Sequence, residues 1–231
     1  MTTSTPHGEL ATLIAAVQGA CTGEALLEAT EALSAKADPG SLGCLMEILT
    51  FNNPGAAVAA VEGLIKIGKP AVAPLLANLD QYNYGARAWA VRVLAGIGDV
   101  RGLAVLEQAL AEDVVPSVRR AAARGLGQLV LDGLGPEERE EATLRCFTSL
   151  EKGQSDGEWI VRYAVAAGLE QLAPALLSHP DVVTQLITNL RSLANEASEP
   201  VVVVRLRADL ALRRLNDQRL DRSISTPELS A

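Results

Sequence analysis

Three of the chain's few aromatic side chains gather around one arginine. The sequence has two Trp, three Tyr and two Phe, and Tyr82, Tyr84 and Trp89 all lie near Arg87, with Asp80 just before them. Guanidinium groups pair with anions, and aromatic faces pack against planar conjugated molecules. The stretch predicts a binding site for a planar anionic ligand. The alternative is that Trp89 only fills the space between helices and that the two Tyr shape a turn.

A second, weaker collection of the same residue types occurs further along the chain. The stretch WIVRY (residues 159–163) contains Trp159, Arg162 and Tyr163. We predict ligand contacts for these three residues as well. For Arg162 a structural role is the alternative, because Asp156 stands six residues before it and could bind it.

Five nine-residue segments align without gaps and show how these residues must be positioned. They are AAVAAVEGL (56–64), ARAWAVRVL (86–94), VRRAAARGL (118–126), VRYAVAAGL (161–169) and VRLRADLAL (204–212). In each segment the first, fifth, eighth and ninth positions hold Ala, Val, Leu or Gly. At about 100° per residue these positions share one helical face. Each segment therefore predicts an amphipathic helix, which a turn precedes.

Helical patterns also run between the segments, so the repeating unit is a helical hairpin. The fold class is predicted as all-α, a right-handed α-α superhelix (HEAT-like solenoid) of about five hairpins with an N-terminal helical cap near residues 8–36. Residues 8–215 are predicted as a single repeat domain, residues 1–7 as a disordered N-terminus, and residues 216–231 as a polar tail.

The second position of four segments is arginine, which predicts a row of stacked guanidinium groups. These are Arg87, Arg119, Arg162 and Arg205. An acid lies six residues before three of them, and ion pairs between repeats would fix the stacking. Residue 81, six before Arg87, is Gln, so the sequence predicts that Arg87 lacks an internal partner and is available to a ligand.

Composition excludes several classes of function. The net charge of −8 argues against nucleic-acid binding, and no apolar run is long enough to insert into a membrane. Cys21, Cys44 and Cys146 are scattered, as expected for reduced thiols in a cytosol-like compartment. With two His and no ligand spacing, no metal site is expected.

The most specific stretches resemble a known family. FNNPGAAVAAVEGL (51–64) and YNYGARAWA (82–90), with SVRRAAARGLGQL and WIVRYAVAAGLEQL, resemble the F-type subunit of the heterodimeric E/F phycobilin lyases over about residues 10–215. The resemblance implies an enzyme that acts with an E-type partner subunit in the cyanobacterial cytoplasm or plastid stroma. This pair attaches a linear tetrapyrrole, most commonly phycocyanobilin, to a cysteine of a phycobiliprotein α subunit. The bilin is then a substrate, and no cofactor is implied.

The resemblance also suggests a chemical role for the cluster. Arginine could pair with a bilin propionate, the aromatic rings could pack on the pyrroles, and Asp80 could act as the acid, with the thiol supplied by the acceptor protein. Some relatives also isomerise the bilin and carry a His/Cys motif near YNYG. No His or Cys lies between Cys44 and Cys146, so isomerase activity is not carried over. The alternatives are a non-catalytic HEAT scaffold, or a chaperone or degradation adaptor for apo-phycobiliprotein.

Overall fold

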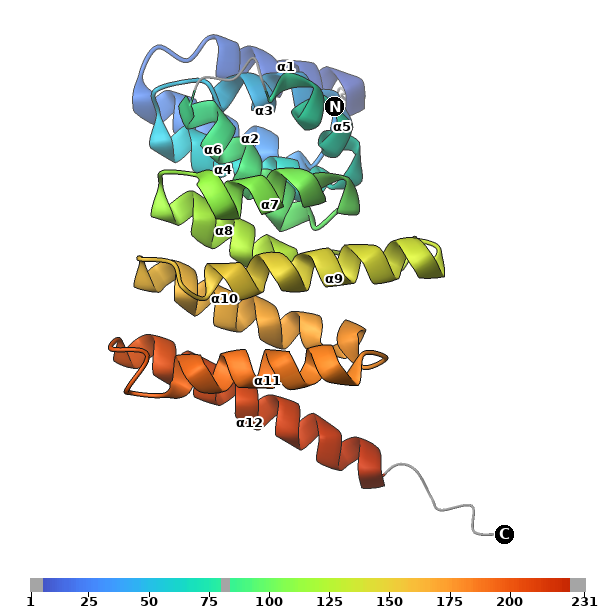
Figure 1. Cartoon of the computed structure of the whole chain (residues 1–231). Coiled ribbons are helices and arrows are strands. Elements are labelled where there is room, and N and C mark those ends of the chain that lie inside the picture. Colours follow the sequence, from blue (N-terminus) through green and yellow to red (C-terminus); the bar gives the residue numbers. More distant parts are fainter. Residues whose placement is uncertain (1–5, 80–83, 225–231) are drawn as a thin grey trace. The chain divides into compact units, whose positions relative to one another are not determined.

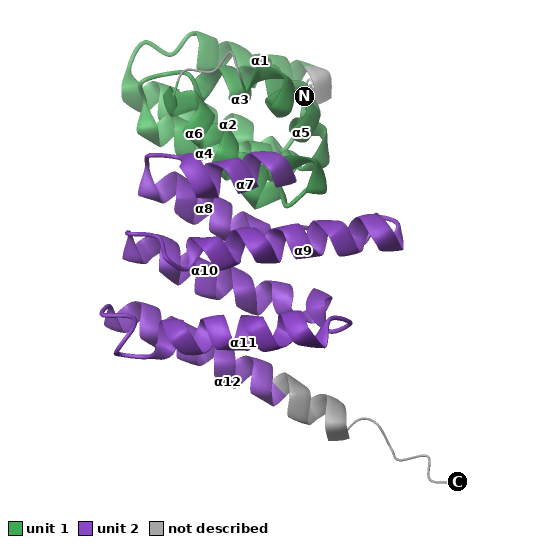
Figure 2. Ribbon diagram, viewed as in Figure 1, with its two compact units in different colours: residues 1–102 green, residues 103–231 purple. Residues whose placement is uncertain are grey.

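The computed structural model describes residues 6–79 and 84–224 of the chain, and within these ranges the regular elements are all helices (Figure 1). The chain forms two compact units, residues 1–102 and 103–231 (Figure 2). The sequence prediction of one repeat domain over residues 8–215 is not decided by this division and stays a prediction. The predicted all-α hairpin repeat is confirmed.

The first unit contains six α-helices within its described residues. They are α1 (Pro6–Gln18), α2 (Gly23–Lys36), α3 (Leu42–Ile48), α4 (Pro54–Ile67), α5 (Lys69–Asn78) and α6 (Tyr84–Ile97). The helices α2, α4 and α6 pack side by side. A Cβ on Gly63 of α4 would lie 2.5 Å from Oγ of Ser34, and that hydroxyl donates to the Ala59 carbonyl at 2.8 Å. Glycine at position 63 is therefore what allows α2 to lie close to α4.

The second unit contains three hairpins that pair α7 with α8, α9 with α10, and α11 with α12. Their helices are α7 (Leu103–Glu112), α8 (Pro116–Gly127), α9 (Pro136–Gly153), α10 (Trp159–Leu172), α11 (Pro180–Ala194) and α12 (Val202–Ile224). The first helices of the hairpins form one layer, and α8, α10 and α12 form the other (Figure 1). Proline at the first helical position begins α8, α9 and α11, where the missing N–H costs no intrahelical bond.

The helices α8 and α10 approach until their backbones touch. A Cβ on Gly127 would lie only 2.4 Å from the Gly168 Cα, and a Cβ on Gly168 would lie 2.8 Å from the Ala123 carbonyl oxygen. Only glycine permits this distance between the two backbones. The close approach sets the exposed side chains of α8 beside those of α10.

The apolar stripe predicted from the five segments forms the core. All positions one, five, eight and nine are buried except Leu212, which is half-buried in the last segment. The helical pair predicted near the N-terminus is present as α1 and α2. Within the described residues, the apolar positions that repeat in the sequence are therefore the positions that form the buried layer of each unit.

The last helix differs from the sequence prediction. Helix α12 continues to Ile224, whereas we predicted a polar tail from residue 216. Residues 216–224 contain no Gly or Pro that would end a helix. Residues 225–231 lie outside the described residues, as do residues 1–5 of the predicted disordered N-terminus.

Candidate functional site

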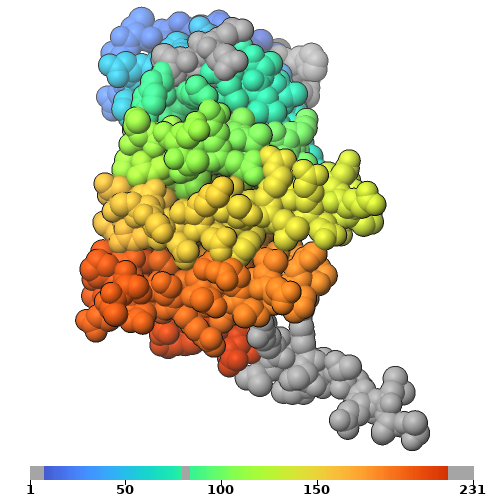
Figure 3. All heavy atoms as spheres, in the orientation of Figure 1, coloured from blue at the N-terminus to red at the C-terminus, as the bar shows by residue number. Residues whose placement is uncertain are grey.

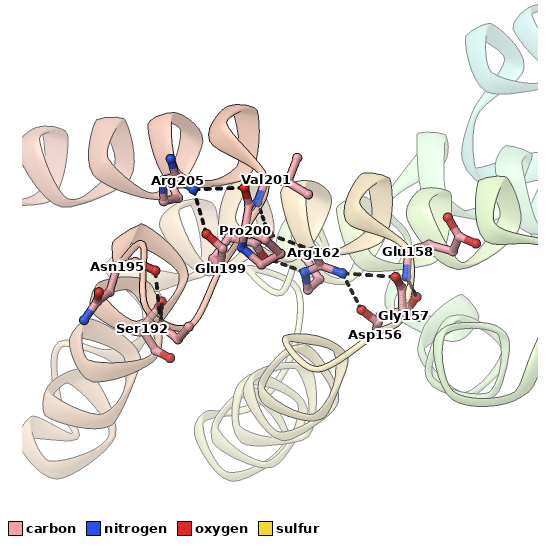
Figure 4. Close-up of polar contacts among 11 residues, drawn as sticks. Asp156, Gly157, Glu158, Arg162, Ser192, Asn195, Glu199, Pro200, Val201 and Arg205 are labelled. Carbon is pink, nitrogen blue, oxygen red and sulfur yellow. Dashed lines mark hydrogen bonds and ion pairs between the residues drawn. The ribbon is translucent and has the colours of Figure 1, made fainter.

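The predicted arginine row is present in the second unit and joins successive hairpins (Figure 4). Arg119 on α8 donates from Nε and Nη2 to the Asp156 carboxylate at 2.7 and 2.9 Å. Arg162 on α10 donates in the same way to Glu199 at 2.6 and 2.8 Å. Both pairs are bidentate, which is the strongest geometry for an arginine and a carboxylate. They fix the register of one hairpin on the next.

Asp156 and Glu199 each bind the arginine of the preceding hairpin and not the arginine six residues after it. The residue six before each arginine contributes its carbonyl instead: Arg119 Nη1 donates to the Asp113 carbonyl at 2.8 Å, and Arg162 Nη1 to that of Asp156 at 2.7 Å. The acid's own carboxylate also accepts the N–H two residues ahead, as Glu199 does from Val201 at 2.9 Å. Asp156 and Glu199 therefore each stabilise the turn in which they lie and also bind an arginine of the preceding hairpin.

This register removes the reason given above for singling out Arg87. By the same pattern, an acid at position 81 would bind an arginine at the second position of the preceding segment. The residue at that position is Ala57. An acid at position 81 would have no arginine to bind, so its absence says nothing about Arg87. The argument from Gln81 therefore fails, because the pairing runs one repeat further along the chain than we assumed, and the ligand role of Arg87 stays a prediction.

Arg87 is nevertheless available on other grounds. Its side chain is exposed on α6, and within residues 8–79 and 84–217 it has no ion pair or hydrogen bond. Tyr84, one turn earlier on α6, is 52% exposed. Residues three apart on a helix share a face, so this tyrosine and this arginine are brought together.

Trp89 is not part of the same face. It is half-buried, and the guanidinium of Arg92 lies 4.4 Å above its ring centroid. Residues two apart on a helix point about 160° away from each other, so Trp89 and Arg87 face different directions. The predicted cluster thus divides into an exposed pair, Tyr84 with Arg87, and a tryptophan already stacked with Arg92. Asp80 and Tyr82 lie outside the described residues.

The second predicted collection divides in a similar way. Trp159 and Tyr163 are 45% and 40% exposed and lie one turn apart on the same face of α10. Arg162 is held by Glu199 and by the carbonyls of Asp156 and Gly157, so the structural alternative holds for it. The two aromatic residues remain candidates for ligand contact, and Arg162 does not.

The electrostatics of the row support its structural role. The hydrogen bonds from Arg162 lower the pKa of Glu199 below the ordinary value of 4.5, although the carboxylate is only 2% exposed. For Asp156, burial alone would raise the pKa, but the bonds from Arg119 and from the Glu158 N–H outweigh it and lower it below 3.8. Both carboxylates are therefore ionised at neutral pH and paired with cations.

Two of the three thiols are poor nucleophiles. Burial raises the pKa of Cys146 to about 12, and burial together with the charge of Glu47 raises the pKa of Cys44. Cys21 is exposed, and its Sγ donates to the Gly19 carbonyl at 3.4 Å. The thiolate is the reactive form of cysteine, so neither Cys44 nor Cys146 is suited to hold a covalent intermediate.

An open groove of about 930 Å³ lies between α7 and α9 in the second unit. Its lining includes charged residues of both signs, such as Glu107 and Arg145, together with the apolar Leu110 and Leu144, and none of its lining residues is aromatic. Glu107 already forms an ion pair with Arg145. Figure 3 views the molecule from the side of these two helices, green and yellow. The groove therefore offers no aromatic face on which a planar conjugated ligand could stack.

The sequence reading did not single out two arginines on α8. Arg120 and Arg124 are exposed, lie one turn apart, and within the described side chains have no ion pair or hydrogen bond. They occupy the third and seventh positions of their segment, and Tyr163 occupies the third position of the next one. The sequence alone shows that Arg120 and Tyr163 hold the same position in successive segments.

Comparison with known proteins agrees with this architecture. A family model of HEAT repeats matches residues 72–149. The "Phycobilisome maturation protein" of Synechococcus elongatus is 47% identical over 206 residues, which cover 88% of this chain and 96% of the relative. "Phycocyanin alpha phycocyanobilin lyase CpcF" of Synechocystis sp. is 51% identical over 165 residues, covering 71% of this chain and 77% of the relative.

A solved structure is similar along most of the chain. The complex of CpcE and CpcF of phycocyanin lyase from Nostoc sp. PCC7120 contains a chain that is 40% identical, with a TM-score of 0.67. The match covers 75% of this chain and 99% of that one. The similarity in sequence extends over almost the whole length of several relatives, and the hairpin repeat is shared. The chain belongs to the family of CpcF-type phycocyanobilin lyase subunits.

Proposed function

We propose that this chain is the F-type subunit of a phycocyanobilin lyase, which acts with an E-type partner to attach the bilin to a cysteine of a phycocyanin α subunit. The observation that carries the proposal is the 40% identity to a chain of the CpcE–CpcF complex over 99% of that chain's length. The 51% identical relative is itself named a phycocyanobilin lyase for phycocyanin α. The cyanobacterial cytoplasm, or a plastid stroma, is the compartment in which such an acceptor is made.

The reaction is an addition and needs no external oxidant or reductant. The acceptor's thiolate adds to the ethylidene carbon of bilin ring A, so a carbon–sulfur bond forms while the carbon–carbon π bond breaks. The electron pair of that bond takes up a proton, and the product is a thioether. Uncatalysed addition gives poor control over the face attacked, and the subunit's contribution is to hold the pigment and the thiol in one geometry.

Each unit has exposed residues that are suited to contact a bilin. In the first unit, Arg87 can donate hydrogen bonds to an oxygen atom of the bilin, and Tyr84 lies on the same face of α6. Trp159 and Tyr163 offer aromatic faces to the pyrroles. The role of Asp80 as the acid and the contact of the Tyr82 ring with the ligand remain predictions. The absence of a cofactor also remains a prediction.

The nucleophilic thiol comes from the acceptor and not from this subunit. Cys146 is fully buried with a raised pKa, and the pKa of Cys44 is also raised. A covalent relay through either thiol would require a thiolate that its surroundings disfavour. We therefore propose that the bilin forms no bond to Cys44 or Cys146 of this subunit.

A non-catalytic scaffold is the second candidate. The observation that favours it is the exposed aliphatic surface of α12, where Val202 and Leu206 are 54% and 61% exposed. Exposed apolar surface of this kind is typical of protein docking sites. In this case the chain would bind an apo-phycobiliprotein, as a chaperone or degradation adaptor does, without handling pigment.

Reconstitution separates the two candidates. The chain, an E-type subunit, phycocyanobilin and apo-phycocyanin α are mixed, and pigment that stays on the α subunit after denaturation is measured by absorbance. We expect covalent attachment only when both lyase subunits are present. If the α subunit is bound but attachment is the same with and without this chain, the scaffold function replaces the lyase function.

A further inference from the structure

The exposed face of the α8, α10 and α12 layer changes in character from one helix to the next. We compared the same three helical positions, which lie one turn apart along each helix. On α8 they hold Pro116 and the two arginines, on α10 they hold Trp159, Tyr163 and a small alanine, and on α12 they hold Val202, Leu206 and Leu210. The face is therefore basic at one side, aromatic in the middle and aliphatic at the other side.

Arg120 and Arg124 on α8 differ from most arginines of this unit. Arg119, Arg145, Arg162 and Arg207 all bind carboxylates. Arg120 and Arg124 bind none among the described residues, and they are exposed four residues apart on one helix. Like charges at this spacing repel each other and destabilise a helix slightly. Among the described residues, neither guanidinium group contributes an ion pair to the packing of the repeats.

The packing of α8 on α10 brings the two kinds of residue next to each other. The backbones touch at Gly127 and Gly168, and neighbouring helices in contact lie about 8–10 Å apart or closer. Tyr163 stands on α10 at the position that Arg120 holds on α8. One ligand of the size of a linear tetrapyrrole can therefore contact both helices.

We infer that Arg120 and Arg124 bind the two propionates of the bilin, while Trp159 and Tyr163 support its pyrrole rings. The two arginines offer one guanidinium group to each of the two carboxylates. The aromatic residues of α10 and the aliphatic residues of α12 lie beyond them, where the apolar rings of the bilin would extend. This inference rests on the proposed lyase function. It adds a basic subsite on α8 that the aromatic cluster at α6 does not include.

The test compares the natural diacid with its dimethyl ester. The complex of this chain with an E-type subunit is titrated with phycocyanobilin and with the diester, and the absorbance change gives both dissociation constants. In the wild-type complex we expect the diacid to bind at least about tenfold more tightly, because each propionate makes a charge-assisted bond. In the Arg120→Gln/Arg124→Gln variant the ratio should fall to about one, since the diester never used these groups.

A matched control removes the same charge elsewhere. Lys66→Gln/Arg191→Gln replaces two exposed cations on α4 and α11, neither of which has a partner among the described residues. This variant should keep the wild-type ratio, which separates a local contact from a general effect of charge. Circular dichroism of each variant confirms that the helices are intact.

Three outcomes overturn the inference, and they are distinguishable. If the α8 variant binds bilin and keeps the wild-type preference for the diacid, the propionates lie elsewhere and the lyase proposal stands. If the variant keeps this preference but loses affinity for apo-phycocyanin α, the arginines dock the acidic acceptor protein. If the wild-type complex binds neither pigment, the proposed function itself fails.

Discussion

Arg87 and Arg162 hold the same position in their repeats, yet replacing each with alanine should have opposite consequences. Arg162 is 13% exposed and holds the 2% exposed carboxylate of Glu199 with two hydrogen bonds of 2.6 and 2.8 Å. Its removal leaves a buried carboxylate without a cation, which costs about 3–5 kcal/mol of unfolding free energy. Arg87 is exposed and has no ion pair or hydrogen bond among the described residues, so its removal should cost at most about 0.5 kcal/mol.

Each unit contains one tryptophan that can report on it alone. In a Trp89→Phe background the fluorescence of Trp159 follows the second unit, and in a Trp159→Phe background Trp89 follows the first. With an m-value of about 2 kcal/mol per M, Arg162→Ala should lower the urea midpoint by about 2 M, and Arg87→Ala by less than about 0.3 M.

Bilin binding with the E-type partner should show the reverse order. At a temperature where both variants are folded, Arg87→Ala should weaken binding of the pigment about tenfold, as expected for a lost charge-assisted bond, and Arg162→Ala should leave it nearly unchanged. Equal midpoint shifts in the two variants would refute the assignment of Arg162 to the internal row. Unchanged pigment affinity in Arg87→Ala would refute the assignment of Arg87 to the ligand.

Three further predictions follow from burial and packing. The pKa of Glu199 is lowered in the folded state, so its contribution to stability is complete above the ordinary value of 4.5 and is lost as pH falls below it. The urea midpoint of Glu199→Gln should therefore fall less between pH 6 and pH 3.5 than that of the wild type, and an identical fall would contradict the pairing. Gly127→Ala should cost about 1–3 kcal/mol because its Cβ meets backbone, whereas Gly133→Ala, which meets nothing within 4 Å, should be neutral in the same unfolding assay. In native protein iodoacetamide should modify Cys21 and spare Cys146, and equal labelling by mass spectrometry would show that Cys146 is accessible.

The fold could be predicted because its information is local. The segments that contain Leu64, Leu94, Leu126, Leu169 and Leu212 repeat one apolar pattern, and a helix that follows this pattern buries the same positions each time. Small residues at the contacts indicated close stacking, and Gly127 against Gly168 is an instance of it.

The site could be predicted only in part, because its contacts join different repeats. The sequence showed that Arg162 and Glu199 belong to one row, but which acid binds which arginine depends on how far one hairpin is displaced along the next. The position of Trp89 was available from the sequence, since a residue two places from Arg87 lies on another face of the helix. Proximity along the chain was taken there for proximity in space.

The central claim is that this subunit holds the pigment without bonding to it and that the acceptor supplies the thiol. Mass spectrometry of both proteins after a single reaction cycle, with the E-type partner present, tests it most directly. The account predicts one bilin added to a cysteine of the α subunit and no bilin mass on this chain at any time point. A bilin adduct on Cys21, Cys44 or Cys146 that forms early and then decays would contradict it.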